Sequence, residues 1–206
     1  MKKQDECKLC RRLGAKLYLK GDRCLTGKCA FERRPYPPGK ERFQRRKMSD
    51  YATHLMEKQK ARAIYAVGER QFRKYFFKAK REKGRTGENL IRILESRLDN
   101  MLYRVGFATS RGQARQMISH RFVKVNGRMV NIPSYLLRKA DVVALIDEAK
   151  KSDFIKAGIE EAVKRGIPSW FQVDADKFTF TVLNIPSTGE VNPPFNEDAV
   201  VELYSK

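Results

Sequence analysis

The sequence predicts an α+β fold: a mostly helical first domain with an N-terminal four-cysteine knuckle, and a module of two helices packed on a small antiparallel sheet. Three observations predict it. The cysteines are confined to the first 29 residues, apolar residues repeat at helical spacing up to residue 118, and strand-like alternation follows around Asn126-Gly127. A chain of 206 residues is long enough for one or two domains with real cores.

The cysteines come first along the chain. They follow the pattern C-x2-C-x13-C-x4-C and are Cys7, Cys10, Cys24 and Cys29. Two close pairs joined by a loop can place four thiolates around one zinc ion, and such a closed site is structural rather than catalytic. A four-iron cluster also accepts four thiolates, and the same four cysteines could instead form disulfides or stay unligated. We expect zinc, because no apolar signal-peptide core follows Met1–Glu6 and a reducing compartment is therefore expected.

A basic extension and two helices should follow the cysteines. Pro35, Pro37 and Pro38 cannot sustain a helix, so they mark an extended connection. Tyr51 and a basic strip before it are expected to contact phosphate, and the strip consists of Arg42, Arg45, Arg46 and Lys47. A cap near Ser49 predicts helices over residues 50 to about 67 and 69 to 83.

The first helix of the module should begin near Glu88 and end at Gly106, a residue type common after helix ends. Its apolar stripe at helical spacing is Leu90, Leu94, Leu98, Met101 and Val105. Arg97 and Arg104 border this stripe, seven residues apart. We therefore expect both side chains beside the apolar face, where they can contact a polyanion.

The second helix should begin at Arg111, because Ser110 stands three residues before Gln113, the spacing of a capping box. Its core-facing residues are Ala114, Met117 and Ile118. Arg111 and Arg115, four residues apart, project from one edge. His120 follows where a helix C-terminus favours positive charge, so it is expected to contact phosphate or cap the helix.

A hairpin comes next. Val123 and Val125 alternate before Asn126-Gly127, the strongest short hairpin signal, and Lys124 and Arg128 flank the turn. Further strands are expected at residues 141–146 and 178–183, with a helix over residues 152–166 between them. Residues 199–204 should pair as a strand or pack back onto the first helices.

The charge is strongly basic, with a formal value of +20 and a pI near 10. Residues 1–150 hold 38 Lys and Arg against 15 Asp and Glu, whereas residues 151–206 hold 6 against 9. Such an excess indicates a polyanionic partner that contacts the first three quarters of the chain. No apolar run approaches the roughly 20 residues that span a bilayer. We therefore expect a cytoplasmic protein without a membrane partner.

The run from Ser96 to Gly127 contains R-L-D, S-R-x-Q-A-R and V-K-V-N-G in order. In this it resembles the RNA-binding module of the bacterial small-subunit ribosomal protein four family, and the resemblance extends over nearly the whole chain. The cysteines resemble the four-cysteine variant of that family. The resemblance implies that the module, residues 94–184, is inserted into a helical domain of residues 48–93 and about 185–206, after a knuckle and extension of residues 1–47.

The resemblance also implies a function. A member of this family is a structural constituent of the small subunit that binds the 5′ domain of ribosomal RNA at a multi-helix junction and starts assembly. It lies beside ribosomal protein five, where messenger RNA enters the ribosome, and it contributes to the accuracy of translation. The module residues expected to contact RNA are Arg97, Arg104, Ser110, Arg111, Gln113, Ala114, Arg115, His120, Lys124, Val125, Asn126, Gly127 and Arg128.

Other functions have weaker support. Tyrosyl-transfer-RNA synthetases and pseudouridine synthases carry the same module, so an RNA-modifying enzyme or another RNA-binding regulator is the main alternative. An enzyme is not expected, because the chain has only two histidines, no phosphate-binding loop and no room for a catalytic domain. A DNA-binding zinc protein is a third possibility, but no helix has base-reading spacing.

Overall fold

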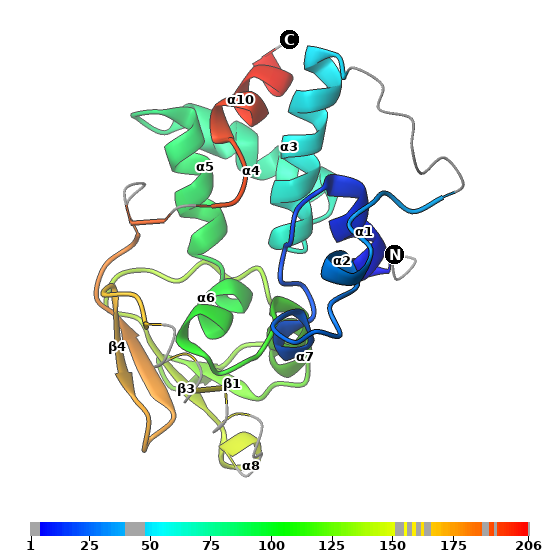
Figure 1. Ribbon diagram of the computed structural model, residues 1–206. Coiled ribbons are helices and arrows are strands. Elements are labelled where there is room, and N and C mark those ends of the chain that lie inside the picture. Colours follow the sequence, from blue (N-terminus) through cyan, green and yellow to red (C-terminus); the bar gives the residue numbers. More distant parts are fainter. Residues whose placement is uncertain are drawn as a thin grey trace. The chain divides into compact units, whose positions relative to one another are not determined.

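The computed structural model describes residues 5–39, 48–150, 155, 158–159, 162, 166–186, 190–191 and 193–205. The chain divides into two compact units, residues 1–91 with 192–206 and residues 92–191 (Figure 1). The sequence-based domains divide instead at residue 93 and at about residue 184. Most of the helix expected over residues 152–166 lies outside the described residues, although residues 155, 158, 159 and 162 are helical.

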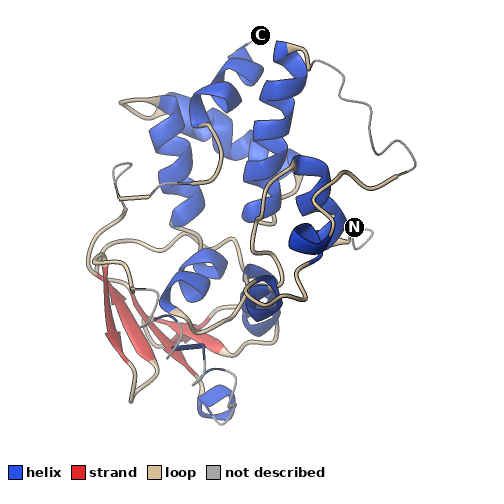
Figure 2. Ribbon diagram, viewed as in Figure 1, coloured by secondary structure: helices blue, strands red, loops and turns tan. Residues whose placement is uncertain are grey.

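The described part of the first unit contains helices joined by loops, and no strands (Figure 2). Its elements are α1 (Glu6–Leu13), η1 (Gly21–Cys24), α2 (Ala30–Arg33), α3 (Asp50–Ile64), α4 (Glu69–Arg81), the beginning of α5 (Thr86–Glu95) and α10 (Glu197–Ser205). Ser49 caps α3 as predicted, because its Oγ accepts a hydrogen bond from the Ala52 backbone N–H at 3.3 Å.

The C-terminal segment is helix α10, and the strand that its sequence allowed is wrong. The alternative, packing onto the first helices, is confirmed: α10 lies against α3 (Figure 1). The Tyr204 ring stacks on Phe76 of α4, with 4.6 Å between ring centroids. The described part of the first unit contains no sheet that this segment could join. A helix instead lets its backbone N–H and C=O groups hydrogen-bond to one another.

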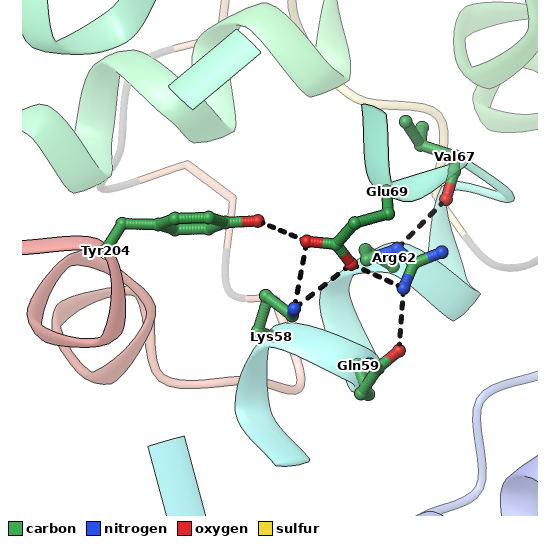
Figure 3. A network of polar contacts seen from close by, with 6 residues as sticks. All are labelled: Lys58, Gln59, Arg62, Val67, Glu69 and Tyr204. Carbon is green, nitrogen blue, oxygen red and sulfur yellow. Dashed lines mark hydrogen bonds and ion pairs between the residues drawn. The ribbon is translucent and has the colours of Figure 1, made fainter. Parts of the chain in front are cut away.

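Glu69 links α3, α4 and α10 through one polar network (Figure 3). Its carboxylate accepts hydrogen bonds from Lys58 Nζ at 2.9 Å, Arg62 Nη1 at 2.7 Å and the Tyr204 hydroxyl at 2.8 Å. Burial alone would raise the pKa of the Glu69 carboxyl, but the hydrogen bonds from Lys58 and Tyr204 lower it. Burial, together with the bond to Glu69, raises the pKa of the Tyr204 phenol. The network therefore favours an ionised Glu69 and a neutral Tyr204.

The second unit combines helices with a five-stranded antiparallel sheet (Figure 2). Its elements are the end of α5, α6 (Leu98–Val105), α7 (Arg111–Ser119), β1 (Val123–Val125), β2 (Arg128–Met129), β3 (Val142–Leu145), α8 (Asp147–Lys150), β4 (Phe171–Asp174) and β5 (Thr179–Val182). The strand order is β2-β1-β3-β5-β4. The hairpin, β3 and β5 confirm the predicted strands, whereas β4 was not predicted. Asn126 and Gly127 have φ values of 49° and 77°, as the tightest hairpin turn requires.

A break between α5 and α6 replaces the single helix expected over residues 88–105. Ser96 and Arg97 pair with a later segment: the Leu98 N–H donates to the Tyr135 carbonyl at 2.8 Å, and the Leu137 N–H donates to the Ser96 carbonyl at 2.9 Å. These long-range bonds take the place of helical ones, so the backbone stays satisfied through the break. The apolar period continues across it because Leu94 and Leu98 are both buried.

Gly106 ends α6 as predicted, with a φ of 92°. A Cβ at this position would lie 2.3 Å from Cβ of Ala162 and 2.7 Å from the Gly158 carbonyl oxygen. Two requirements therefore favour glycine here, the left-handed conformation and the close approach of a later segment of the same unit.

Candidate nucleic-acid interface

A buried carboxylate, Asp99, lies beside two arginines of the second unit. Its side chain is 1% exposed, and its Oδ1 accepts a hydrogen bond from Arg97 Nε at 3.0 Å. Arg115 Nη1 lies 3.5 Å from Asp99 Oδ2, while 39% of the Arg115 side chain remains exposed. Asp99 therefore neutralises one buried arginine and orients one that reaches the surface.

The burial of Arg97 contradicts the prediction that its side chain lies at the RNA-contacting surface. The residue is only 2% exposed. Its guanidinium is directed inward by Asp99, because a buried charge is tolerated only when it is paired and hydrogen-bonded. Arg97 therefore belongs to the framework of the site.

A second buried carboxylate, Glu95, positions Arg104. Its side chain is 1% exposed and accepts hydrogen bonds from Arg104 Nε at 3.0 Å and Nη2 at 2.7 Å. Asn100 Nδ2 also donates to Glu95, at 2.7 Å. This two-point contact fixes the plane of the Arg104 guanidinium. The Arg104 side chain is 31% exposed, so it still reaches the surface.

Asn100 extends the arrangement to Arg111. Its Oδ1 accepts a hydrogen bond from Arg111 Nε at 2.8 Å. The Arg111 guanidinium lies 4.4 Å from the ring centroid of Tyr103, close enough for a cation–π contact. Arg104, Arg111 and Arg115 are named the arginine cluster, since each is held by a carboxylate or amide from residues 95–100.

The neutral residues expected to contact RNA serve the fold. Ser110 Oγ accepts from the Gln113 N–H at 3.2 Å, and Gln113 Oε1 accepts from the Thr109 N–H at 2.7 Å, so both cap α7. Asn126 Nδ2 donates to Asp141 Oδ1 at 2.8 Å, while its Oδ1 accepts from the Val142 N–H at 2.9 Å. These side chains build the surface that carries the cations.

The remaining predicted residues differ in exposure. Ala114 and Val125 are 0% and 4% exposed, so their side chains are core residues, which corrects their expected contact with RNA. The residues at the surface are His120, Gly127 and Arg128, with Lys124 partly exposed. In the first unit Tyr51 is 64% exposed. The basic strip lies outside the described residues and comprises Arg42, Arg45, Arg46 and Lys47.

The sequence did not lead us to predict the residues that hold the arginines in place, which are Glu95, Asp99, Asn100 and Tyr103. The available signal was the presence of acidic and amide residues, at positions 95, 99 and 100, beside an otherwise apolar stripe. A carboxylate at such a position needs a cationic partner, because burial without one is costly. The break between α5 and α6, which brings residues 95–100 together, was not predictable from that pattern.

All four cysteines line one pocket of the first unit. Cys10, Cys24 and Cys29 are buried, and Cys7 is partly exposed. Burial raises the pKa of the Cys10 and Cys24 thiols, while hydrogen bonds from the backbone of Leu17 and Lys20 act in the opposite sense. No group of three or more His, Cys, Asp and Glu side chains in the described ranges is arranged as a metal site. The donor chemistry itself, four thiols with backbone N–H groups beside two of them, suits a soft divalent cation.

None of the described helices has both the length and the apolar character required to cross a bilayer. Arginines held by buried carboxylates on a helix–hairpin unit, in a chain that also contains a helical unit, are typical of a protein that binds a polyanion such as RNA. Two family models match accordingly, "Ribosomal protein S4/S9 N-terminal domain" over residues 1–95 and "S4 domain" over residues 96–143.

Full-length relatives give the family. Proteins described as "Small ribosomal subunit protein uS4" from Magnetococcus marinus and Nitratidesulfovibrio vulgaris are each 51% identical, over 98% of this chain and 97% of theirs. One from Pelotomaculum thermopropionicum is 52% identical over 97% of this chain and 96% of its own. The chain belongs to the small ribosomal subunit protein uS4 family.

Proposed function

We propose that this protein is a structural constituent of the small ribosomal subunit and works in the cytoplasm as part of the ribosome. It binds the 5′ domain of small-subunit ribosomal RNA at a multi-helix junction and starts assembly there. Beside ribosomal protein five it helps to form the region where messenger RNA enters, and it contributes to the accuracy of translation. Membership of the uS4 family supports this function and does not favour an RNA-modifying enzyme.

The arginine cluster is the observation that carries RNA binding. Cations that neutralise phosphates release counterions, which supplies affinity for any nucleic acid. Selectivity for a folded RNA must come from shape, because side chains cannot read the deep groove of an A-form helix. Arg104 and Arg111 are each held by partners from residues 95–100, so their positions match one arrangement of phosphates better than others.

The direct test is the salt dependence of binding to a 5′-domain junction fragment. Arg111→Ala with Arg115→Ala should weaken binding and reduce the slope of log K against log salt by about 1.4 to 1.8, corresponding to two phosphates. Lys177→Ala is the control, since its side chain is 79% exposed and lies outside the basic part of the chain. An unchanged slope in the double variant contradicts the assignment.

Crosslinking to total cellular RNA separates this function from its rivals. Ribosomal RNA attached to the purified protein supports the proposal. Transfer RNA with chemical turnover would identify an RNA-modifying enzyme instead, and chromosomal DNA would identify a transcription factor.

We further propose that Cys7, Cys10, Cys24 and Cys29 hold a structural zinc ion. Their shared pocket and the backbone donors beside two thiols support this, and an iron–sulfur cluster is the alternative. Such an ion would fold a segment too short and too charged to have its own core. Elemental analysis should find about one zinc per chain, and chelation should alter the amide spectrum of the first forty or so residues while the rest stays folded. Unchanged spectra there, or the visible absorption of iron–sulfur, contradict zinc.

A further inference from the structure

The outward face of α4 combines positive charge with one aromatic ring. Positions three and four residues apart along the helix form a continuous exposed stripe, named the α4 stripe: Arg70, Arg73, Lys74, Phe77, Lys78 and Arg81. The opposite face is the buried one and consists of Phe72, Tyr75, Phe76 and Ala79. The α4 stripe is therefore not needed to hold the first unit together.

The cations of the α4 stripe differ from three basic residues on neighbouring segments of the first unit. Lys58 and Arg62 are paired with Glu69, and Arg85 lies 3.4 Å from a carboxylate oxygen of Asp198. By contrast, none of the five cations of the α4 stripe forms an ion pair with a carboxylate of the described residues. Five charges of one sign, without carboxylate partners in the part of the chain that the structure describes, lie along about 16 Å of helix and create a strongly positive surface.

Phe77 lies in the middle of this positive surface. It is 43% exposed, although the transfer of a phenyl ring out of water is favourable. The Arg73 guanidinium lies 5.5 Å from the ring centroid, and the Phe76 ring contacts it edge to face with 5.9 Å between centroids. The ring is thus held from the buried side by Phe76 and polarised by Arg73, while part of it faces solvent.

We propose that the α4 stripe is a second RNA-binding surface, on which the cations follow phosphates and Phe77 stacks on an unpaired base. The proposal rests on the proposed function, because it takes the same ribosomal RNA as ligand. Charge complementarity selects a polyanion, and the central ring selects a loop or bulge over a continuous duplex, whose base faces are not accessible. None of the residues expected to bind RNA from the sequence lies on this face.

The test is a salt series with the 5′-domain fragment that compares the unchanged chain with Phe77→Ala, Phe77→Leu and Phe77→Trp. The alanine and leucine variants should bind about tenfold more weakly with an unchanged salt slope, because a stacking contact is lost and no charge is removed. Tryptophan should retain the affinity. Lys74→Ala with Lys78→Ala should instead lower the slope by about 1.4 to 1.8.

Leu183→Ala is the matched control, since Leu183 is 44% exposed and lies in the other unit. Phe77 is exposed, so circular dichroism should show that its variants remain folded. If the unchanged chain does not bind the fragment, both the proposed function and this inference fail. If it binds and neither Phe77→Ala nor the lysine pair has an effect, the α4 stripe is excluded and the proposed function stands. If Phe77→Leu binds as well as the unchanged chain, stacking is wrong, and the face fits an apolar protein contact.

Discussion

The arginine cluster of the second unit and the α4 stripe of the first present positive charge in opposite ways. In the arginine cluster, each guanidinium contacts a carboxylate or amide from residues 95–100, and both carboxylates are only 1% exposed. In the α4 stripe, the cations extend from a helix face without carboxylate partners in the described part of the chain. One region orients its charges, whereas the other only concentrates them.

The difference has a physical consequence for RNA binding. A buried acid lowers the net charge of a surface, so it weakens non-specific attraction to phosphate. In return it fixes the guanidinium plane, which allows two-point contact with a phosphate in one orientation. We therefore expect the arginine cluster to supply selectivity and the α4 stripe to supply affinity, with Phe77 adding a contact to an unpaired base.

The largest effect should come from breaking the buried pair beneath the arginine cluster. Asp99→Ala removes the carboxylate that neutralises the buried Arg97, which should lower the free energy of unfolding by about 3–5 kcal/mol. Urea unfolding measures the change. Arg97→Met with Asp99→Leu is the control, and it should be more stable than the single variant because both buried charges of the pair are removed together. A single variant as stable as the unchanged chain would show that the pair is dispensable.

A second test separates orientation from charge. Glu95→Gln removes a negative charge, so simple electrostatics predicts tighter RNA binding. We expect weaker binding, by about 1 kcal/mol or fivefold, because Arg104 loses its charged acceptor. Filter binding with the 5′-domain fragment decides between the two. Glu88→Gln removes a carboxylate that is 38% exposed instead and should bind no more weakly than the unchanged chain. Equal effects of both variants would contradict the orienting role.

The Glu69 network allows a pH-dependent test of an ion pair whose carboxylate is neither fully buried, as in the arginine cluster, nor absent from the described residues, as in the α4 stripe. The folded-state pKa of Glu69 is lowered, so its stabilisation is present above the ordinary value of 4.5 and is lost as the pH falls through the folded value. Glu69→Gln should therefore cost stability at pH 7 and converge with the unchanged chain under acid conditions. The cost should stay below about 1 kcal/mol, because 45% of the side chain is exposed. Urea unfolding at the two pH values measures it, and a difference that grows on acidification contradicts the sign.

The smallest effect should come from removing a cation of the α4 stripe. Lys78→Ala should change the free energy of unfolding by no more than about 0.5 kcal/mol, because its side chain has no carboxylate partner in the described residues. Arg104→Ala is the comparison and should cost about 1–3 kcal/mol, since it leaves Glu95 buried with one partner fewer. Thermal unfolding of both variants measures the contrast, and similar costs would mean that the α4 stripe also supports the fold.

Local signals predicted much of this fold. Ser49 and Ser110 cap helices, Gly106 ends one, and Asn126-Gly127 turns the hairpin, because each effect depends on neighbouring backbone groups. The long-range features were missed. The break at Ser96 and Arg97 exists because residues 135–137 pair with it, and strand β4 exists because β5 supplies its partner.

The amino-acid sequence by itself determined the strong positive charge, its absence from the last quarter, the four clustered cysteines and the positions of most helices. These depend on composition and on contacts within a few residues along the chain. Only the tertiary structure decided that Arg97 is buried, that Glu95 and Asp99 orient the arginine cluster, and that the C-terminal segment is a helix packed against α3. The reason is that burial and ion pairing depend on which distant segments meet, and a local pattern carries no information about that meeting.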